Sequence, residues 1–270
     1  MSTNDLTSLP PQHYKKTVLT TDKGRIIDLI TILNYSDHSI VLTTENYEQR
    51  ITEHLDKYII MDDVFIERPE KKYSSLIVWG EGIANKINEL ESITLSGDNF
   101  FEKEDNIIFA DDFGYEKVIY LTGEDKADNI KEKFPGSAEF SFNNYENFRI
   151  SLGIAEGENE FNDLINPKEC GLERYISYTK GCYIGQEVIA RLDAQGKIPK
   201  QMVKLVSDSS LTKDEKIYLD GKEVGVITSV SGNIGLGFIR SIAIDTSKEY
   251  ESAGCKIKIE KILFNEEILN

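Results

Sequence analysis

The stretch KGCYIGQE at residues 180–187 holds the residue types best suited to chemistry in this sequence. Cys182 lies between a glycine and a tyrosine, close to Lys180 and just before a helical pattern that begins near Gln186. The unpaired N–H groups at a helix N-terminus and a neighbouring ammonium both lower the pKa of a thiol. The flanking glycines let the backbone bend sharply and approach a ligand closely. We therefore predict that Cys182 is a reactive thiol and that Lys180 helps to ionise it.

The neighbours of this cysteine have roles of their own. Tyr183 offers an aromatic face for stacking and a hydroxyl that can donate a hydrogen bond. Gln186 and Glu187 fall in the first turn of the helix, where a negative charge is favoured. They are expected to cap and orient the loop, with direct ligand contact as the alternative. For Cys182 the alternative is a small buried hydrophobe, as most free cysteines are; its polar and glycine neighbours favour the reactive interpretation.

Other thiol and metal chemistry finds little support. The three histidines all lie within the first 54 residues, far from Cys182, whereas a cysteine protease needs an imidazole beside its thiol. Cys170, Cys182 and Cys255 lack the spacing of zinc or iron–sulfur ligands, so no metal site is expected from this chain alone. One cysteine could still complete a cluster shared with another protein.

Composition narrows the class of protein. The 47 acidic residues exceed the 31 basic residues and give a net charge of −16, which argues against direct binding to nucleic acid or anionic lipid. No stretch approaches the roughly 18 apolar residues of a membrane span, the start lacks the apolar core of a secretory signal, and three scattered cysteines suit a reducing cytoplasm. A basic island could serve a small anionic ligand, with chance scatter as the alternative. It comprises Lys180, Arg191, Lys197, Lys200 and Lys204.

The elements that must position these residues change in character along the chain. β-Branched runs at 15–20, 25–33 and 39–44 predict strands. Asn46 and Gln49 form a capping-box pattern that predicts a helix start at Asn46. Residues 75–142 then follow the β-α-β-β-α-β order of a ferredoxin-like unit. The expected elements are strands at 75–79, 106–110, 117–121 and 137–142 and helices at 81–90 and 124–134.

The remaining chain divides into two parts. A helix is expected at 144–154 and another at 187–195, with an irregular polar segment at 154–170 between them. Beyond residue 200 the sequence predicts short strands, with hairpin turns at Asp220-Gly221 and at 231–233. Such regular spacing indicates a small barrel or sandwich.

Placed in this order, KGCYIGQE resembles the signature of the YgfZ-type folate-binding proteins. These form a branch of the glycine-cleavage T-protein (aminomethyltransferase-like) superfamily and are related to mitochondrial iron–sulfur cluster assembly homologues. Four further segments are similar to family segments in the same order: TNDLTSL (3–9), TDKGRIIDL (21–29), YIIMDDVFIE (58–67, a strand) and FRISLGI (148–154).

The resemblance implies an α+β fold in the form of a three-lobed ring with a folate in a central channel. A mixed α/β lobe would comprise residues 1–48 and 143–198, with an N-terminus shorter than usual in the family. A ferredoxin-like lobe would span 49–142, and a C-terminal β-barrel 199–270.

The resemblance also implies a function. The chain would bind tetrahydrofolate or a derivative and act as a cytoplasmic accessory protein in iron–sulfur cluster assembly or repair and, through client enzymes, in tRNA modification. Its partners would be iron–sulfur assembly proteins or client iron–sulfur enzymes. Asp28, Arg149 and Tyr183 would surround the folate. Arg149 would pair with a ligand carboxylate or, as the alternative, form a structural salt bridge.

A folate-dependent aminomethyltransferase, or another one-carbon transferase, is the alternative function. Transferases of the superfamily carry an Asp-Asp pair where this chain has Ile27-Asp28, and a glutamate where it has Ser151. Such carboxylates are suited to orienting and protonating a folate amine, so their loss favours the accessory role. A scaffold that no longer binds a ligand is the third interpretation.

Overall fold

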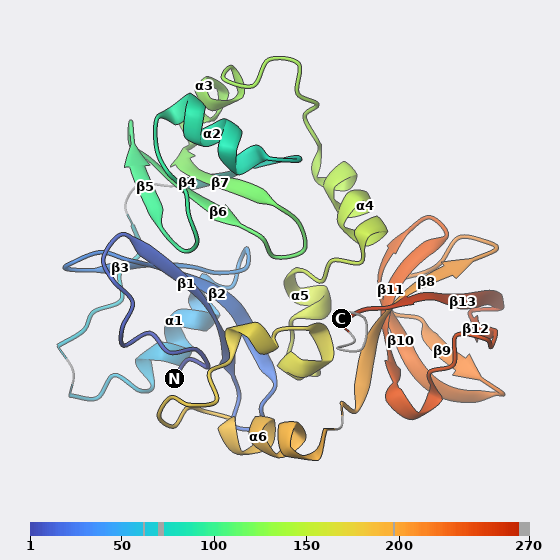
Figure 1. Cartoon of the computed structure of the whole chain (residues 1–270). Helices are drawn as coiled ribbons and strands as arrows, with labels where there is room; N and C mark the ends of the chain where they lie inside the picture. Colours follow the sequence, from blue (N-terminus) through green and yellow to red (C-terminus); the bar gives the residue numbers. More distant parts are fainter. Residues whose placement is uncertain (62, 70–72, 197, 265–270) are drawn as a thin grey trace.

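Three lobes surround a central helical segment in the computed structural model, which describes residues 1–61, 63–69, 73–196 and 198–264 (Figure 1). Sheets and short helices alternate in the first two lobes, and the last lobe is a closed barrel. The α+β class, the three lobes and the C-terminal barrel are confirmed. Among the described residues, no helix is both long and apolar enough to cross a membrane.

The first lobe combines the N-terminal part of the chain with a helix that follows the second lobe in sequence. Its antiparallel sheet has the order β1-β2-β3, and the three strands lie where the β-branched runs predict strands. The elements are β1 (His13–Thr20), β2 (Ile26–Asn34), β3 (Ser39–Leu42), α1 (Glu48–Asp56) and, from much later in the chain, α6 (Gln186–Gln195).

The predicted capping box of α1 is wrong. The helix starts one residue later than expected, with Tyr47 as its N-cap and no side-chain capping bond. Asn46 has a φ of 65°, in the left-handed region, which Asn tolerates better than most residues. The residue therefore serves the turn before the helix instead of the cap.

The second lobe is an antiparallel sheet of four strands in the order β4-β7-β6-β5. Its elements are β4 (Tyr73–Trp79), α2 (Ile83–Glu91), β5 (Phe100–Lys103), β6 (Asn106–Asp111), β7 (Lys117–Gly123), the 3₁₀ turn η1 (Glu124–Lys126) and α3 (Ala127–Lys131). The predicted helices and the first three predicted strands are confirmed in position, whereas the fourth strand comes from an unexpected place.

The strand predicted at 137–142 is wrong, and β5 takes its place in the sheet. Residues 135–144 are all exposed, and α4 already begins at Phe142. β5 pairs with β6 through a two-residue turn in which Glu104 and Asp105 have φ values of 52° and 64°. A turn of this kind usually carries Asn-Gly or Asp-Gly, so KEDN gave no recognisable signal. The ferredoxin-like order is therefore not reproduced.

The strand expected within 58–67 is also not formed by the described residues of that range. Ile60, Met61 and Phe65 are more than four-fifths exposed there. Without a neighbouring strand to bond its backbone, an apolar run does not become a strand on propensity alone.

The central segment connects the second lobe to the barrel. It contains α4 (Phe142–Leu152), α5 (Gly157–Glu160) and two 3₁₀ turns, η2 (Pro167–Cys170) and η3 (Glu173–Tyr175). Apart from α5 and η2, the segment 154–170 is irregular as predicted. The C-cap of α4 is Gly153, which has a φ of 79°, and a Cβ at this position would lie 2.7 Å from Leu263 Cδ2, so a larger residue would be strained here.

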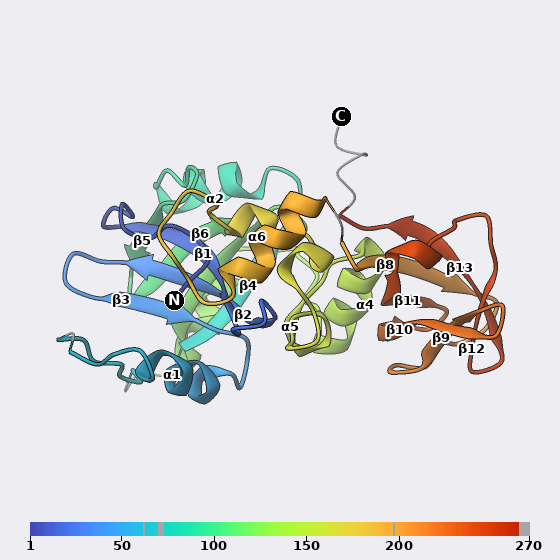
Figure 2. The same ribbon diagram turned by 90° about the horizontal axis from the view of Figure 1, so that it is seen from below.

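The C-terminal lobe is a closed barrel in the order β10-β11-β8-β13-β12-β9, which decides between barrel and sandwich (Figure 2). The predicted turn at Asp220-Gly221 is present, with both φ values positive. The elements are β8 (Lys200–Ser207), β9 (Lys216–Leu219), β10 (Lys222–Ser231), β11 (Ile234–Arg240), η4 (Ser241–Ala243), β12 (Tyr250–Ser252) and β13 (Cys255–Ile262).

A shared core holds the barrel to the first lobe. Val18 and Ile26 of the first sheet pack in one buried cluster with Ile165 of the central segment and with Met202 and Phe238 of the barrel. Burying such side chains contributes about 1.5–3 kcal/mol each. The lobes therefore meet through continuous apolar packing, which fixes the loops between them.

Candidate functional site

The cysteine loop is fastened to the turn that joins β1 and β2. Gly185, the N-cap of α6, has a φ of 81°, and a Cβ at this position would lie 2.5 Å from Thr21 O and 2.8 Å from Gly24 Cα. Thr20 Oγ1 donates a hydrogen bond to Ile184 O in the same contact. TDKGR and KGCYIGQE, two of the segments that carry the resemblance, thus touch each other glycine to glycine.

Cys182 is exposed at the tip of this loop, four residues before α6 begins at Gln186. The exposed thiol excludes the alternative of a buried hydrophobic cysteine. The Gln186 side chain accepts a hydrogen bond from Tyr183 N at 3.4 Å, in line with its expected capping role. Glu187 is exposed in the first turn of the helix.

Lys180 ties the loop to the start of the chain. Its Nζ donates hydrogen bonds to Ser2 O at 2.9 Å and to Asn4 O at 2.8 Å. Burial lowers the pKa of Lys180. The ammonium therefore anchors the backbone of Ser2 and Asn4 to the loop, a contact that no local pattern indicated.

Tyr183 is buried instead of presenting an open face. Its ring belongs to a small apolar cluster with Ile176 and Ile189, and burial raises the pKa of its hydroxyl to about 12. Tyr183 thus holds the loop against α6, because its ring packs against Ile189 of that helix.

Arg149 has its donors engaged by protein groups. The side chain is 1% exposed, and its Nε and Nη2 donate to the two carboxylate oxygens of Glu146 at 2.6 and 2.8 Å. Nη1 donates to Glu160 Oε2 at 3.2 Å and to Ile154 O at 3.1 Å, and Nη2 also donates to Ser229 Oγ at 3.0 Å. These contacts match the structural salt bridge, one of the two roles considered for Arg149.

Asp28 lies buried on β2 and holds the loop that leads to α1. Its carboxylate accepts hydrogen bonds from Thr44 N at 2.9 Å and from Thr44 Oγ1 at 2.7 Å. Burial raises the pKa of Asp28, and the hydrogen bonds from Thr44 oppose that rise. A carboxylate has about four lone-pair sites, so Asp28 retains capacity for further donors.

Two residues near Asp28 were not anticipated. The Arg50 guanidinium lies 5.0 Å from the centroid of the Tyr47 ring, and its charge acts on Asp28. Burial raises the pKa of the half-buried Tyr47; the charge of Arg50 opposes this rise, and those of Glu158 and Asp28 reinforce it. The three-residue spacing of Tyr47 and Arg50 at a helix start was the available signal. A carboxylate, an aromatic face and a guanidinium are the groups that suit a folate.

The other predicted features do not add to this site. The basic island is divided between the cysteine loop, α6 and β8, and Lys204 is paired with Glu260, while Lys197 falls outside the described residues. Two shallow pockets of about 260 and 140 Å³ lie on the second lobe, beside the turn at 104–105. None of the predicted site residues lines them.

The fold is that of a glycine-cleavage aminomethyltransferase. The crystal structure of glycine cleavage system aminomethyltransferase T from Bartonella henselae matches with a TM-score of 0.80 at 15% identity, covering 98% of this chain and 79% of that one. Residues 200–262 match the family model described as the CAF17 C-terminal beta-barrel domain.

The sequence relatives include a plant protein that matches one part of this chain and bacterial aminomethyltransferases that match most of it. A putative chloroplastic transferase of Arabidopsis thaliana is 38% identical over 105 residues, which are 37% of this chain but only 24% of that protein. The aminomethyltransferase of Thermoanaerobacter pseudethanolicus is 23% identical over 95% of this chain and 74% of its own length, and that of Caldanaerobacter subterraneus is 23% identical over 88% and 70%. The chain is similar to aminomethyltransferases over most of its length.

Proposed function

We infer that the chain is a folate-binding accessory protein that supports iron–sulfur cluster assembly or repair, with Cys182 as its working thiol. The observation that carries this proposal is the exposed thiol on a loop that is fastened to the TDKGR turn and to the first residues of the chain. A thiol held in this way is available to a partner protein, because the loop presents it to solvent instead of enclosing it.

The folate would bind near Asp28. Asp28 would accept hydrogen bonds from the ring N–H groups, Tyr47 would stack on the ring, and Arg50 would pair with a carboxylate of the tail. When bound, a tetrahydrofolate supplies a one-carbon carrier. Arg149 is left out of this set because its contacts are with protein groups.

A one-carbon transferase is the second candidate, favoured by the aminomethyltransferase relatives. Two observations favour the accessory role instead. Ser151 is exposed, and its Oγ donates to Phe148 O at 2.7 Å, so this position offers no carboxylate to a folate amine. The Asp28 carboxylate accepts two hydrogen bonds from Thr44, and the residue before it is Ile27 where the transferases have a second aspartate.

The partners would be iron–sulfur assembly proteins or client iron–sulfur enzymes in the cytoplasm, and any effect on tRNA modification would follow from those clients. The cluster would be cargo or substrate. Thiolates are the usual ligands of such clusters, and a solvent-accessible thiolate can provide one. Direct contact with nucleic acid is not proposed, because the net charge of −16 opposes it.

Folate binding is tested by titrating tetrahydrofolate into the wild type and into Asp28→Asn, Arg50→Ala and Arg191→Ala proteins. Arg191, on α6, is the matched control because it is exposed and belongs to no proposed contact. Loss of a charge-assisted contact should weaken binding about 10-fold in the first two variants and leave the control unchanged. Equal affinity in all four proteins would remove Asp28 and Arg50 from the site.

The thiol is tested separately in a strain that lacks the gene. Cys182→Ala should bind tetrahydrofolate like the wild type but fail to restore the activity of iron–sulfur enzymes, whereas Cys255→Ala should restore it. Full rescue by Cys182→Ala would exclude the thiol from the function. Turnover of a lipoyl-linked aminomethyl donor by the purified chain would favour the transferase.

A further inference from the structure

The three lobes meet around α4 and α5 (Figure 1). Polar side chains from all three lobes and from the central segment make contacts along this junction. At one end, Lys16 of β1 in the first lobe pairs with Asp111 of β6 in the second lobe at 2.7 Å, and Lys117 of β7 lies 3.2 Å from the same carboxylate oxygen. The Lys117 ammonium also lies 4.4 Å from the centroid of the Tyr115 ring. Although burial raises the pKa of Asp111, the two lysines outweigh this effect and bring it below its usual value.

At the other end, the fully buried Glu160 joins the central segment to the barrel. It accepts hydrogen bonds from Arg149 at 3.2 Å and from Thr228 and Ser229 of β10 at 2.7 Å each. Both ends of the junction are therefore made of charges that are paired at close range.

Glu156, between the two ends, is different. Among the described residues, its carboxylate receives a hydrogen bond from one donor, the neutral hydroxyl of Tyr145 on α4. The charges that face it are Arg149 and Glu146 of α4 and Lys117 of β7. Burial raises the pKa of Glu156, while Tyr145, Arg149 and Lys117 oppose that rise.

This carboxylate lies on the boundary between lobes. Tyr145 belongs to the central segment, whereas Tyr115, which feels the charge of Glu156, belongs to the loop between β6 and β7 of the second lobe. Glu156 N also donates to Glu160 Oε2 at 3.2 Å, which connects the same residue to the barrel clamp. The Tyr145 ring also lies 6.4 Å from Trp79 of the second lobe. A change of charge at Glu156 therefore acts on the contact between the central segment and the second lobe.

We propose that protonation of Glu156 controls how tightly the second lobe is held against α4 and α5. Glu156 keeps part of its surface exposed, but its carboxylate has a single neutral donor in the closed junction. The neutral acid is therefore favoured in the closed junction, whereas loosening of the junction would hydrate the carboxylate more fully. The closed junction holds the proton more firmly than an open one. Linkage then requires that acidification tightens the junction and that raising the pH loosens it. The pKa of Asp111 is lowered, so Asp111 is protonated only at a pH below that at which Glu156 is protonated. Protonation of Asp111 would weaken its pairs with Lys16 and Lys117, which is opposite to the effect of Glu156.

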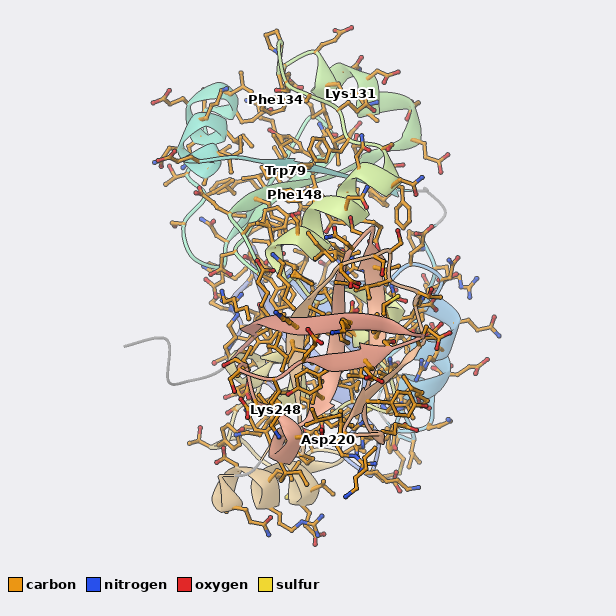
Figure 3. The ribbon with its side chains drawn as sticks, turned by 90° about the vertical axis from the view of Figure 1, so that its right-hand side faces the viewer. Trp79, Lys131, Phe134, Phe148, Asp220 and Lys248 are labelled. Carbon is orange, nitrogen blue, oxygen red and sulfur yellow. The ribbon has the colours of Figure 1, made fainter. Side chains whose placement is uncertain are left out.

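The chain carries a built-in reporter of this junction. Trp79, its single tryptophan, stacks on Phe148 of α4 with ring centroids 5.3 Å apart. The rings of Tyr115 and Tyr145 lie at 6.1 and 6.4 Å from it. Figure 3 shows Trp79 and Phe148 side by side where the second lobe meets α4. Quenching of Trp79 fluorescence therefore reports opening at this boundary.

The test measures acrylamide quenching of Trp79 in the full chain from about pH 5 to pH 8, the range above the ordinary carboxylate pKa. The wild type should show one step, with stronger quenching at higher pH. Glu156→Gln, which keeps an acceptor for Tyr145 but cannot ionise, should lose the step. Glu169→Gln is the matched control, since burial also raises the pKa of Glu169 but its partners are Arg25 and Asn166. This control should keep the step.

A second variant guards against a Glu156→Gln protein that folds poorly. Tyr145→Phe removes the hydrogen bond that stabilises the carboxylate, so the midpoint of the step should move to higher pH. A wild type without a step, a step that persists in Glu156→Gln, or a midpoint unmoved by Tyr145→Phe would each overturn the proposal.

Discussion

Arg149 gives the sharpest test of how the central segment is held. Arg149→Met keeps most of the side-chain volume but removes every contact to Glu146, Glu160 and Ser229. Glu160 is fully buried, so the substitution leaves a buried carboxylate without its positive partner. Breaking a buried pair by removing one member costs about 3–5 kcal/mol. We expect a loss of that size in the free energy of unfolding, because no other cation of the described residues is within 4.0 Å of Glu160.

Urea unfolding of the purified chain measures this loss, with Lys216→Met as the control. Lys216 and Glu223 form an ion pair at 3.1 Å in which both side chains are about half exposed, so its loss should cost less than about 1 kcal/mol. The double variant Arg149→Met with Glu160→Gln should recover part of the stability, since the stranded charge is gone. A loss below about 1 kcal/mol in Arg149→Met, or a strongly reduced folate affinity in a protein of unchanged stability, would refute the structural role.

Further outcomes follow from the loop and from Asp28. Gly185→Ala should destabilise the chain by about 1–3 kcal/mol in urea unfolding, because the φ of Gly185 is positive and a Cβ would meet backbone atoms. Gly181→Ala is the control: its Cβ would meet no atom within 4 Å, so stability should change by less than about 0.5 kcal/mol. Equal effects of the two substitutions would contradict the packing described. Burial raises the folded-state pKa of Asp28. The contribution of Asp28 to stability should therefore decline as the pH rises from its unfolded-state pKa of about 3.9 through the higher folded-state pKa. Asp28→Asn should flatten this decline in the free energy of unfolding, and an unchanged slope would contradict the raised pKa. Lys180→Met should speed hydrogen exchange at the backbone of residues 2–4, measured by mass spectrometry, and unaltered exchange would mean that the ammonium does not anchor them.

Local patterns predicted those parts of the fold that depend on near neighbours. The strands of the barrel, the start of α6 and the bend at Gly185 follow from alternation, helix periodicity and glycine, which act within a few residues. The hairpin at Glu104-Asp105 was missed because its turn lacks glycine, and the strand expected at 137–142 failed because no strand lies there to pair with it.

The partners of the site residues could not be read from the sequence. Arg149 bonds Ser229, 80 residues away, and Lys180 bonds Asn4, 176 residues away. Such pairs are set by how the lobes pack, and a single sequence carries no record of that packing. Tyr47 and Arg50 were within reach of a local pattern, but their importance depends on Asp28, which only the sheet brings near them.

The first lobe is completed by residues that leave the ribosome long after its sheet. The bond from Thr20 to Ile184 joins residues 164 positions apart, and the whole second lobe is synthesised between them. At about 5–20 residues per second, roughly 8–30 s pass before the TDKGR turn can meet its glycine partner. During translation the sheet of the first lobe forms before α6 is available to pack with it, and the second lobe has time to fold first. The thiol loop is therefore assembled late, so that Cys182 reaches its presented position only when the rest of the first two lobes is already in place.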